Sequence, residues 1–105
     1  MYNDTQQCDT QYPWLKEAME DFDEFDPEID TQSAKTFIEH ASYYIKEIPM
    51  ISQSDGGNIF IEWNTKMIVF QEENKVFFYD SSTEKREKIC CSQSDWIDRL
   101  IELCK

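Results

Sequence analysis

The sequence predicts an α+β domain made of two N-terminal helices, an antiparallel meander of three or four strands, and a C-terminal helix. Apolar residues recur at three- and four-residue steps up to residue 49, alternate with polar residues between residues 50 and 79, and return to helical spacing after residue 94. Helices that flank a run of strands are typical of an antiparallel sheet with helices packed on it. The chain of 105 residues fits a single domain, 1–105, in which the polar residues 1–11 are expected to be flexible.

The first helix is predicted to start at Pro13, which is tolerated in a first turn, and to stop at Asp26-Pro27, because the residue before proline disfavours the α conformation. Its apolar stripe comprises Trp14, Leu15, Ala18, Met19, Phe22 and Phe25. The second helix is predicted to be capped by Asp30 or Thr31 and to end before Pro49. Its stripe comprises Ala34, Phe37, Ile38, Ala41, Tyr44, Ile45 and Ile48.

Three strands are predicted at 59–63, 67–71 and 75–79, preceded by a short strand at 50–52. The segments between them are typical of turns: Asp55-Gly56-Gly57, Asn64-Thr65-Lys66 and Glu72-Glu73-Asn74. The aromatic residues Phe60, Phe70 and Phe78 predict that both faces of the sheet are partly covered.

The polar segment 80–88 is predicted to be a loop or an edge strand. Ser92 or Ser94 can then cap the last helix. The apolar residues of that helix are Trp96, Ile97, Leu100, Ile101 and Cys104.

The densest charge lies in the stretch 17–30, where eight of fourteen residues are acidic and none is basic. These acids are Glu17, Glu20, Asp21, Asp23, Glu24, Asp26, Glu28 and Asp30. The whole chain has 22 acids against 10 bases and a net charge of −12, so this stretch carries most of the excess. Such a density of like charge costs stability through self-repulsion, which a basic partner would relieve. Phe22 and Phe25 stand among the acids and could serve as apolar anchors for that partner.

Two other interpretations of this stretch stay open. Lys85, Arg86 and Lys88 form the only basic cluster of the sequence, and they could fold against the acids within the chain. Alternatively, the acids could be a solvated surface that keeps the protein soluble, as many charge runs do.

No residue set in the sequence identifies a reaction, so no enzyme activity, cofactor or metal site is expected. An EF-hand counted from Asp21 would need glycine at its sixth position and glutamate at its twelfth, where the chain has Asp26 and Gln32. The adjacent pair Cys90-Cys91 lacks the spacing of a zinc-binding unit, and His40 is remote from it in sequence. The four cysteines, Cys8, Cys90, Cys91 and Cys104, are expected to be reduced structural thiols.

The expected location is the cytoplasm. The chain has no apolar run long enough to cross a membrane, and its N-terminal residues lack the basic and apolar regions of a secretory signal. Its acidic character opposes direct binding to nucleic acid or to an anionic membrane.

These observations predict a small acidic inhibitor that binds a basic, nucleic-acid-handling protein, with its carboxylates imitating the phosphates of a duplex. An anti-CRISPR or other anti-defence protein of a phage or mobile element would work in this way, as would an antitoxin or an immunity protein against a nuclease. The alternative is a non-inhibitory structural or adaptor module, in which the Asp-Gly-Gly hairpin and a sheet edge mediate assembly.

The segment from Pro49 to Trp63 resembles a pattern found in small, mostly uncharacterised proteins of bacteria and mobile elements. These proteins have a helix, a proline-led strand, an Asp-Gly-Gly turn, a strand that ends in Glu-Trp, and a short meander. The resemblance extends over residues 34–79, and the matching positions are Asp55, Gly56, Gly57, Glu62 and Trp63. It implies a helix–hairpin fold and defines no activity. We expect the glycines to shape a turn, Trp63 to anchor the sheet, and Glu62 to point to the opposite face.

Overall fold

The computed structural model describes residues 11–26, 28–54, 56–71 and 74–104, which contain three helices and five strands. Asp55 of the Asp-Gly-Gly turn and Cys8 lie outside the described residues, as does Pro27. In chain order the elements are α1 (Leu15–Asp23), α2 (Gln32–Ala41), β1 (Met50–Gln53), β2 (Ile59–Trp63), β3 (Lys66–Gln71), β4 (Lys75–Asp80), β5 (Lys85–Cys90) and α3 (Trp96–Cys104).

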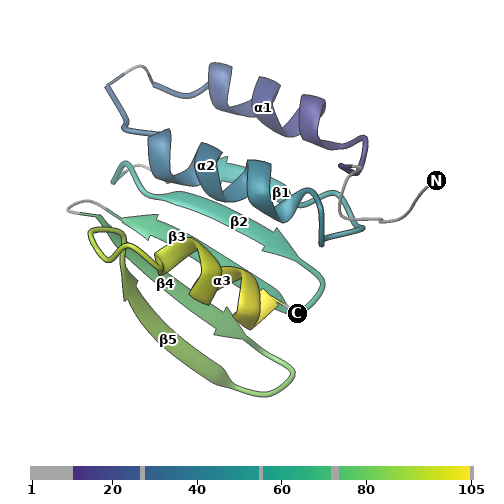
Figure 1. Ribbon diagram of the computed structural model, residues 1–105. Coiled ribbons are helices and arrows are strands. Elements are labelled where there is room, and N and C mark those ends of the chain that lie inside the picture. The colour runs from purple at the N-terminus through teal and green to yellow at the C-terminus, as the bar shows by residue number, and fades with distance from the viewer. Residues whose placement is uncertain (1–10, 27, 55, 72–73, 105) are drawn as a thin grey trace.

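The strands form one antiparallel sheet whose spatial order, β1-β2-β3-β4-β5, follows the sequence. All three helices lie on the same face of this sheet (Figure 1). Helix α2 lies between α1 and α3; α1 packs near β1, and α3 packs near β5. The predicted α+β class is confirmed, and the number of strands is higher than predicted.

The additional strand is β5, within the segment that was expected to be a polar loop or an edge strand. The sequence of β5 lacks a clear alternation of apolar and polar residues, because Ile89 is its only buried residue and Lys85, Arg86 and Lys88 are exposed. Charged side chains are common on edge strands, where they discourage pairing with another chain. The sequence signal of an edge strand is therefore weaker than that of a central strand.

Helix α2 ends at Ala41, which is earlier than the apolar stripe up to Ile48 predicted. Two interactions account for the early end. The Ser42 hydroxyl donates a 2.6 Å hydrogen bond to the Glu39 carbonyl, and such side-chain bonds compete with helical ones. The Trp14 indole Nε1 donates a 2.8 Å bond to the Ile45 carbonyl. Ile45 consequently stays in the core, whereas Ile48 is 53% exposed.

The core lies between the sheet and the helices. Its most fully buried large side chains come from α2, the three central strands and α3: Phe37, Ile38, Ile59, Ile61, Ile68, Val76, Phe78 and Leu100. Phe70 of β3 joins the layers, because its ring centroid is 6.0 Å from that of Phe37 and 6.2 Å from that of Trp96. Edge-to-face or tilted pairs at such distances are favourable beyond the area they bury.

The opposite face of the sheet, which we call the open face, carries none of the three helices of the described residues (Figure 1). Its central residues, two from each of four strands, are Phe60, Glu62, Met67, Val69, Phe77, Tyr79, Arg86 and Lys88. The prediction was that both faces would be partly covered; the three helices cover only one face, and on the open face Val69 is nevertheless 6% exposed. Phe70 and Phe78 point to the helices and are buried, whereas Phe60 is half-buried on the open face.

Candidate functional site

The eight acids of the stretch 17–30 lie on α1 and on the connection from α1 to α2, and we call them the acidic surface. Seven of them are exposed and Asp21 is partly exposed. They face outward because α1 buries its other side, which includes Trp14, Ala18 and Phe22. A helix with one apolar stripe must place its remaining residues in solvent, so the packing of α1 gathers the acids on one surface.

Local hydrogen bonds fix the connection between α1 and α2. The Asp26 carboxylate accepts a bond from the Glu28 N–H, and the Asp30 carboxylate accepts one from the Gln32 N–H, both at 3.0 Å. The cap position of α2 is Thr31, whose side chain forms no capping bond, and Asp30 instead bonds the first N–H of the helix from the residue before the cap. The Asp26 N–H in turn donates to the Gln53 side chain at 3.1 Å, which ties the connection to β1. Part of the acidic surface is therefore held in place before any partner binds.

The two phenylalanines of this region do not offer the exposed anchors that the sequence suggested. Phe22 is 4% exposed and belongs to the core. Phe25 is half-buried and packs edge-to-face on Phe22, with the ring centroids 5.6 Å apart. Phe22 thus packs in the core beneath the acidic surface. Of the two phenylalanines, only Phe25 is partly exposed beside the acids.

The basic cluster does not neutralise the acidic surface. Lys85, Arg86 and Lys88 are on β5, whereas α1 packs near β1 at the opposite edge of the sheet (Figure 1). Within the described part of the chain, none of the eight carboxylates forms an ion pair; the pairs present are Lys66–Asp80 and Arg99–Glu87. The self-repulsion of the acidic surface is accordingly uncompensated by these cations.

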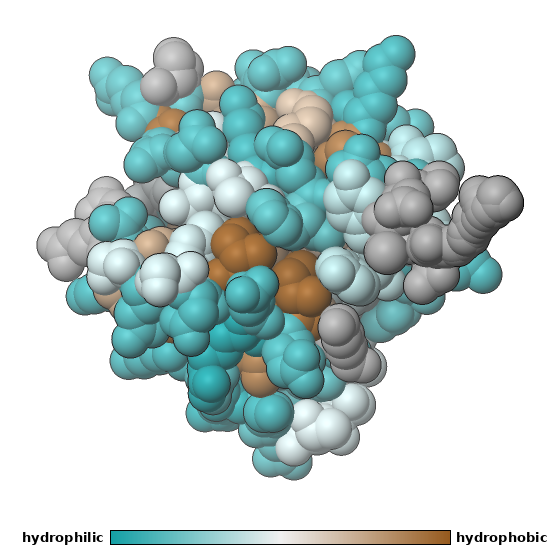
Figure 2. All heavy atoms as spheres, in the orientation of Figure 1, coloured by the Kyte–Doolittle hydropathy of each residue, from teal (hydrophilic) through white to brown (hydrophobic). Residues whose placement is uncertain are grey.

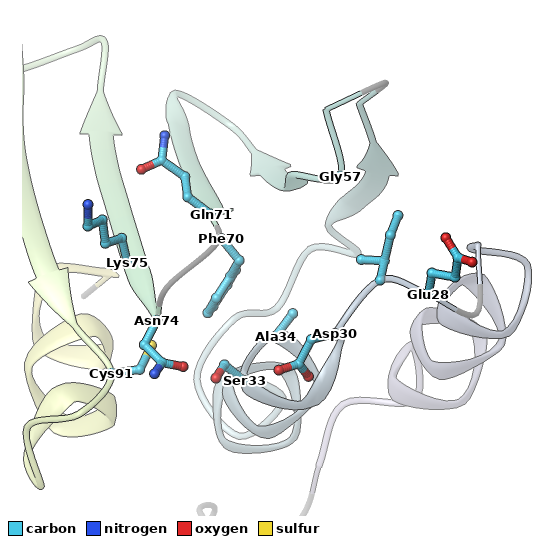
Figure 3. Close-up of a pocket in the computed structure, with 11 residues that line it drawn as sticks. Glu28, Asp30, Ser33, Ala34, Gly57, Phe70, Gln71, Asn74, Lys75 and Cys91 are labelled. Atoms are coloured by element: carbon cyan, nitrogen blue, oxygen red, sulfur yellow. The ribbon is translucent and has the colours of Figure 1, made fainter.

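The acidic surface ends at a cavity of about 400 Å³ between the start of α2 and one end of the sheet (Figure 3). Glu28 and Asp30 line its helical side, and Lys75 and Asn74 stand on the sheet side. The lining of the cavity therefore includes acidic residues from the helical side and a basic residue, Lys75, from the start of β4. These residues are distant in sequence, and no pattern in the chain indicated that they would meet.

Cys91 also lines this cavity, and burial raises the pKa of its thiol, which keeps it protonated. Burial similarly raises the pKa of Cys104 to about 12. Cys90 differs, because hydrogen bonds with Ser92 and the charge of Lys75 lower the pKa of its thiol. The described cysteines, Cys90, Cys91 and Cys104, are all free thiols, and the His40 Nδ1 contacts the Thr36 carbonyl of its own helix at 2.9 Å.

Gly56 and Gly57 lie in the turn between β1 and β2. The Gly57 N–H donates to the Ser54 carbonyl at 3.0 Å, and the Ser54 N–H donates to the Asn58 carbonyl at 2.9 Å. Gly57 has a φ of +85°, a conformation that L-residues rarely adopt. Beyond the turn, Trp63 is buried in the core and Glu62 is exposed on the open face, as predicted. Gly57 and Trp63 thus have structural roles.

Gly57→Ala should lower the free energy of unfolding by about 1–2 kcal/mol, because alanine is strained at this positive φ. A new methyl group would otherwise meet only ordinary contacts, the nearest being Ile29 at 4.0 Å. Gly56→Ala is the matched control, since Gly56 lacks a positive φ and has room for a methyl group. The control should change stability by less than about 0.5 kcal/mol in urea unfolding. Equal losses in both variants would contradict the assignment of strain to Gly57.

No group of three or more histidine, cysteine, aspartate or glutamate side chains among the described residues could hold a metal ion. None of their helices is both long enough and apolar enough to span a membrane.

No protein family, curated protein sequence or solved structure matches this chain.

Proposed function

We propose that this protein binds and inhibits a basic, nucleic-acid-handling protein in the cytoplasm, with the acidic surface as its binding site. The observation that supports the proposal is the exposure of these acids without ion pairs among the described residues, far from the basic strand β5. A nuclease or a CRISPR effector has a basic groove for nucleic acid, and carboxylates repeated along a helix offer that groove a substitute for phosphates. An anti-defence protein, an antitoxin or a nuclease immunity protein that binds in this way would fit the proposal.

The electrostatic argument has an energetic and a kinetic side. Like charges held close together on one surface repel one another, so pairing with a basic groove relieves a cost already present in the free protein. Opposite potentials also steer the two partners together and raise the association rate at low salt. The hydrogen-bonded connection at Asp26 and Asp30 reduces the ordering that binding would require. These features favour a capture surface over a surface that serves solubility alone.

The test is a four-site variant, Glu20→Gln, Asp21→Asn, Asp23→Asn and Glu24→Gln. A matched control neutralises four exposed acids elsewhere: Glu39→Gln, Glu47→Gln, Asp98→Asn and Glu102→Gln. Both variants have the same net charge, so a general charge effect would alter them equally. The acidic-surface variant should lose about tenfold or more in affinity, since each exposed pair contributes about 0.2–1 kcal/mol.

The measurement is a tagged pull-down from the cells that carry the gene, followed by titration of the retained protein. We expect wild type and control to retain a basic nucleic-acid-binding protein, to release it as ionic strength rises from about 0.1 to 1 M, and to block its binding to nucleic acid. Retention of the same proteins by all three forms would contradict the proposal. Salt-insensitive retention of a protein that keeps its own activity would favour the adaptor module instead.

A further inference from the structure

The open face of the sheet has an ordered arrangement of side chains. Strand pairing places Glu62, Met67, Tyr79 and Arg86 side by side in one row across β2 to β5. A neighbouring row contains Phe60, Val69, Phe77 and Lys88 in the same order. Each row therefore has apolar or aromatic residues on β3 and β4 and a basic residue on β5.

The aromatic residues of this face are partly buried by their neighbours. Phe60, Phe77 and Tyr79 are half-buried, and Val69 is only 6% exposed although no helix covers it. The Arg86 guanidinium lies 5.3 Å from the centre of the Tyr79 ring, a cation–π arrangement that positions its charge at the edge of the face. The helix-bearing face is hydrophilic over most of its area, with a few apolar residues near the centre of the view (Figure 2).

We infer that the open face binds the open face of a second copy of this chain, forming a symmetric dimer. Two sheets stacked face to face pack about 10 Å apart with their strands nearly aligned. A two-fold axis parallel to the strands, midway between β3 and β4, places β2 of one copy over β5 of the other. Glu62 of each copy then faces Arg86 of its partner, and Phe60 faces the aliphatic stem of Lys88.

The charge pattern of the open face favours a second copy of this chain as the binding partner. The two-fold axis reverses the strand order, so Glu62 of each copy lies opposite Arg86 of the other copy. The interface therefore contains two such pairs, which is the self-complementarity that a two-fold interface requires. At the centre, the same axis sets Val69 against Phe77, so the apolar residues meet apolar residues. A single-stranded nucleic acid could also stack on the aromatic residues of this face, and the experiment below separates it from a second copy of the chain.

The dimer would leave the proposed binding site accessible. The helices, and with them the acidic surface, lie on the side of the sheet that faces away from the second copy (Figure 1). Each dimer would thus display two acidic surfaces. The inference does not depend on the proposed function, because the interface uses none of the eight acids.

A charge exchange between Glu62 and Arg86 tests the arrangement. Glu62→Arg alone would set arginine against arginine across the interface, and Arg86→Glu alone would set glutamate against glutamate. Each single variant should weaken self-association by about tenfold or more, since like charges opposed in an interface are unfavourable. The double variant should restore association close to the wild-type value, because it recreates the two pairs with the charges reversed. Both positions are exposed, so the fold should survive the changes.

Sedimentation equilibrium of the full chain, from micromolar to near-millimolar concentration, provides the readout. A dimer lost in both single variants and recovered in the double variant would support the inference. A wild-type monomer throughout this range would overturn it, as would single variants that associate normally or a double variant that does not recover. Binding of a single-stranded oligonucleotide by a monomer, lost on Phe77→Ala, would assign the face to nucleic acid instead.

Discussion

Phe70→Ala should reduce the free energy of unfolding by about 3–5 kcal/mol, a large part of the stability of a domain of this size. Phe70 is 6% exposed and contacts Phe37 of α2 and Trp96 of α3, so its removal leaves a cavity where three elements meet. The rings around it cannot collapse into that space without moving two helices. Urea unfolding monitored by tryptophan fluorescence measures the loss, with circular dichroism as a second probe of cooperativity.

Phe77→Ala is the matched control for this prediction. Phe77 is the same residue type on the adjacent strand, but it lies half-buried on the open face. At concentrations too low for self-association, its truncation should cost about 1–2 kcal/mol, within the ordinary range for point substitutions. Equal losses at Phe70 and Phe77 would mean that both faces are packed to the same degree, contrary to the placement of all three helices on one face.

The helices and central strands were predictable because their apolar periodicity records which side of each element is buried. Ile59, Ile61 and Trp63 alternate with exposed or half-buried residues, and all three lie in the core. The end of α2 was not predictable in this way. Its apolar stripe continues to Ile48, but the Trp14 indole, thirty-one residues away from Ile45, holds the backbone outside the helix. A long-range hydrogen bond leaves no local signal in the sequence.

The candidate site was likewise predictable only in part. The acidic surface could be predicted because its eight acids lie within fourteen consecutive residues, on one helix and the connection that follows it. Its separation from Lys85, Arg86 and Lys88 could not be predicted, because it depends on the strand order of the finished sheet. The burial of Phe22 was predictable because it belongs to the same apolar stripe of α1 as Trp14 and Ala18. A residue of that stripe packs in the core and is not available as an exposed anchor for a partner. The open face could have been predicted by continuing the alternation of inward- and outward-facing residues from β4 into β5.

Asp80→Asn should remove a pH-dependent part of the protein's stability. Asp80 ends β4, and its carboxylate accepts hydrogen bonds from the Ser82 hydroxyl at 2.7 Å, the Thr65 hydroxyl at 2.8 Å and the Ser82 N–H at 2.9 Å. The Lys66 ammonium is 3.8 Å from its second oxygen. The carboxylate thus joins the turn after β2 to the turn after β4. These bonds, led by that of the Ser82 hydroxyl, lower the pKa of Asp80 from 3.8 to about 2.

The direction of the pH effect follows from that pKa. Because the folded protein holds the carboxylate below its unfolded pKa of 3.8, the ionised group stabilises the fold at every pH above about 4, and this contribution is lost as the pH falls towards 2. Wild type should therefore unfold at higher urea than Asp80→Asn at neutral pH, and the two midpoints should converge near pH 2. Asp23→Asn, which alters an exposed aspartate of α1, is the control for the loss of one charge. A midpoint difference at Asp80 that stays constant down to pH 2 would show that the asparagine disturbs packing, and that the carboxylate charge does not stabilise the two turns.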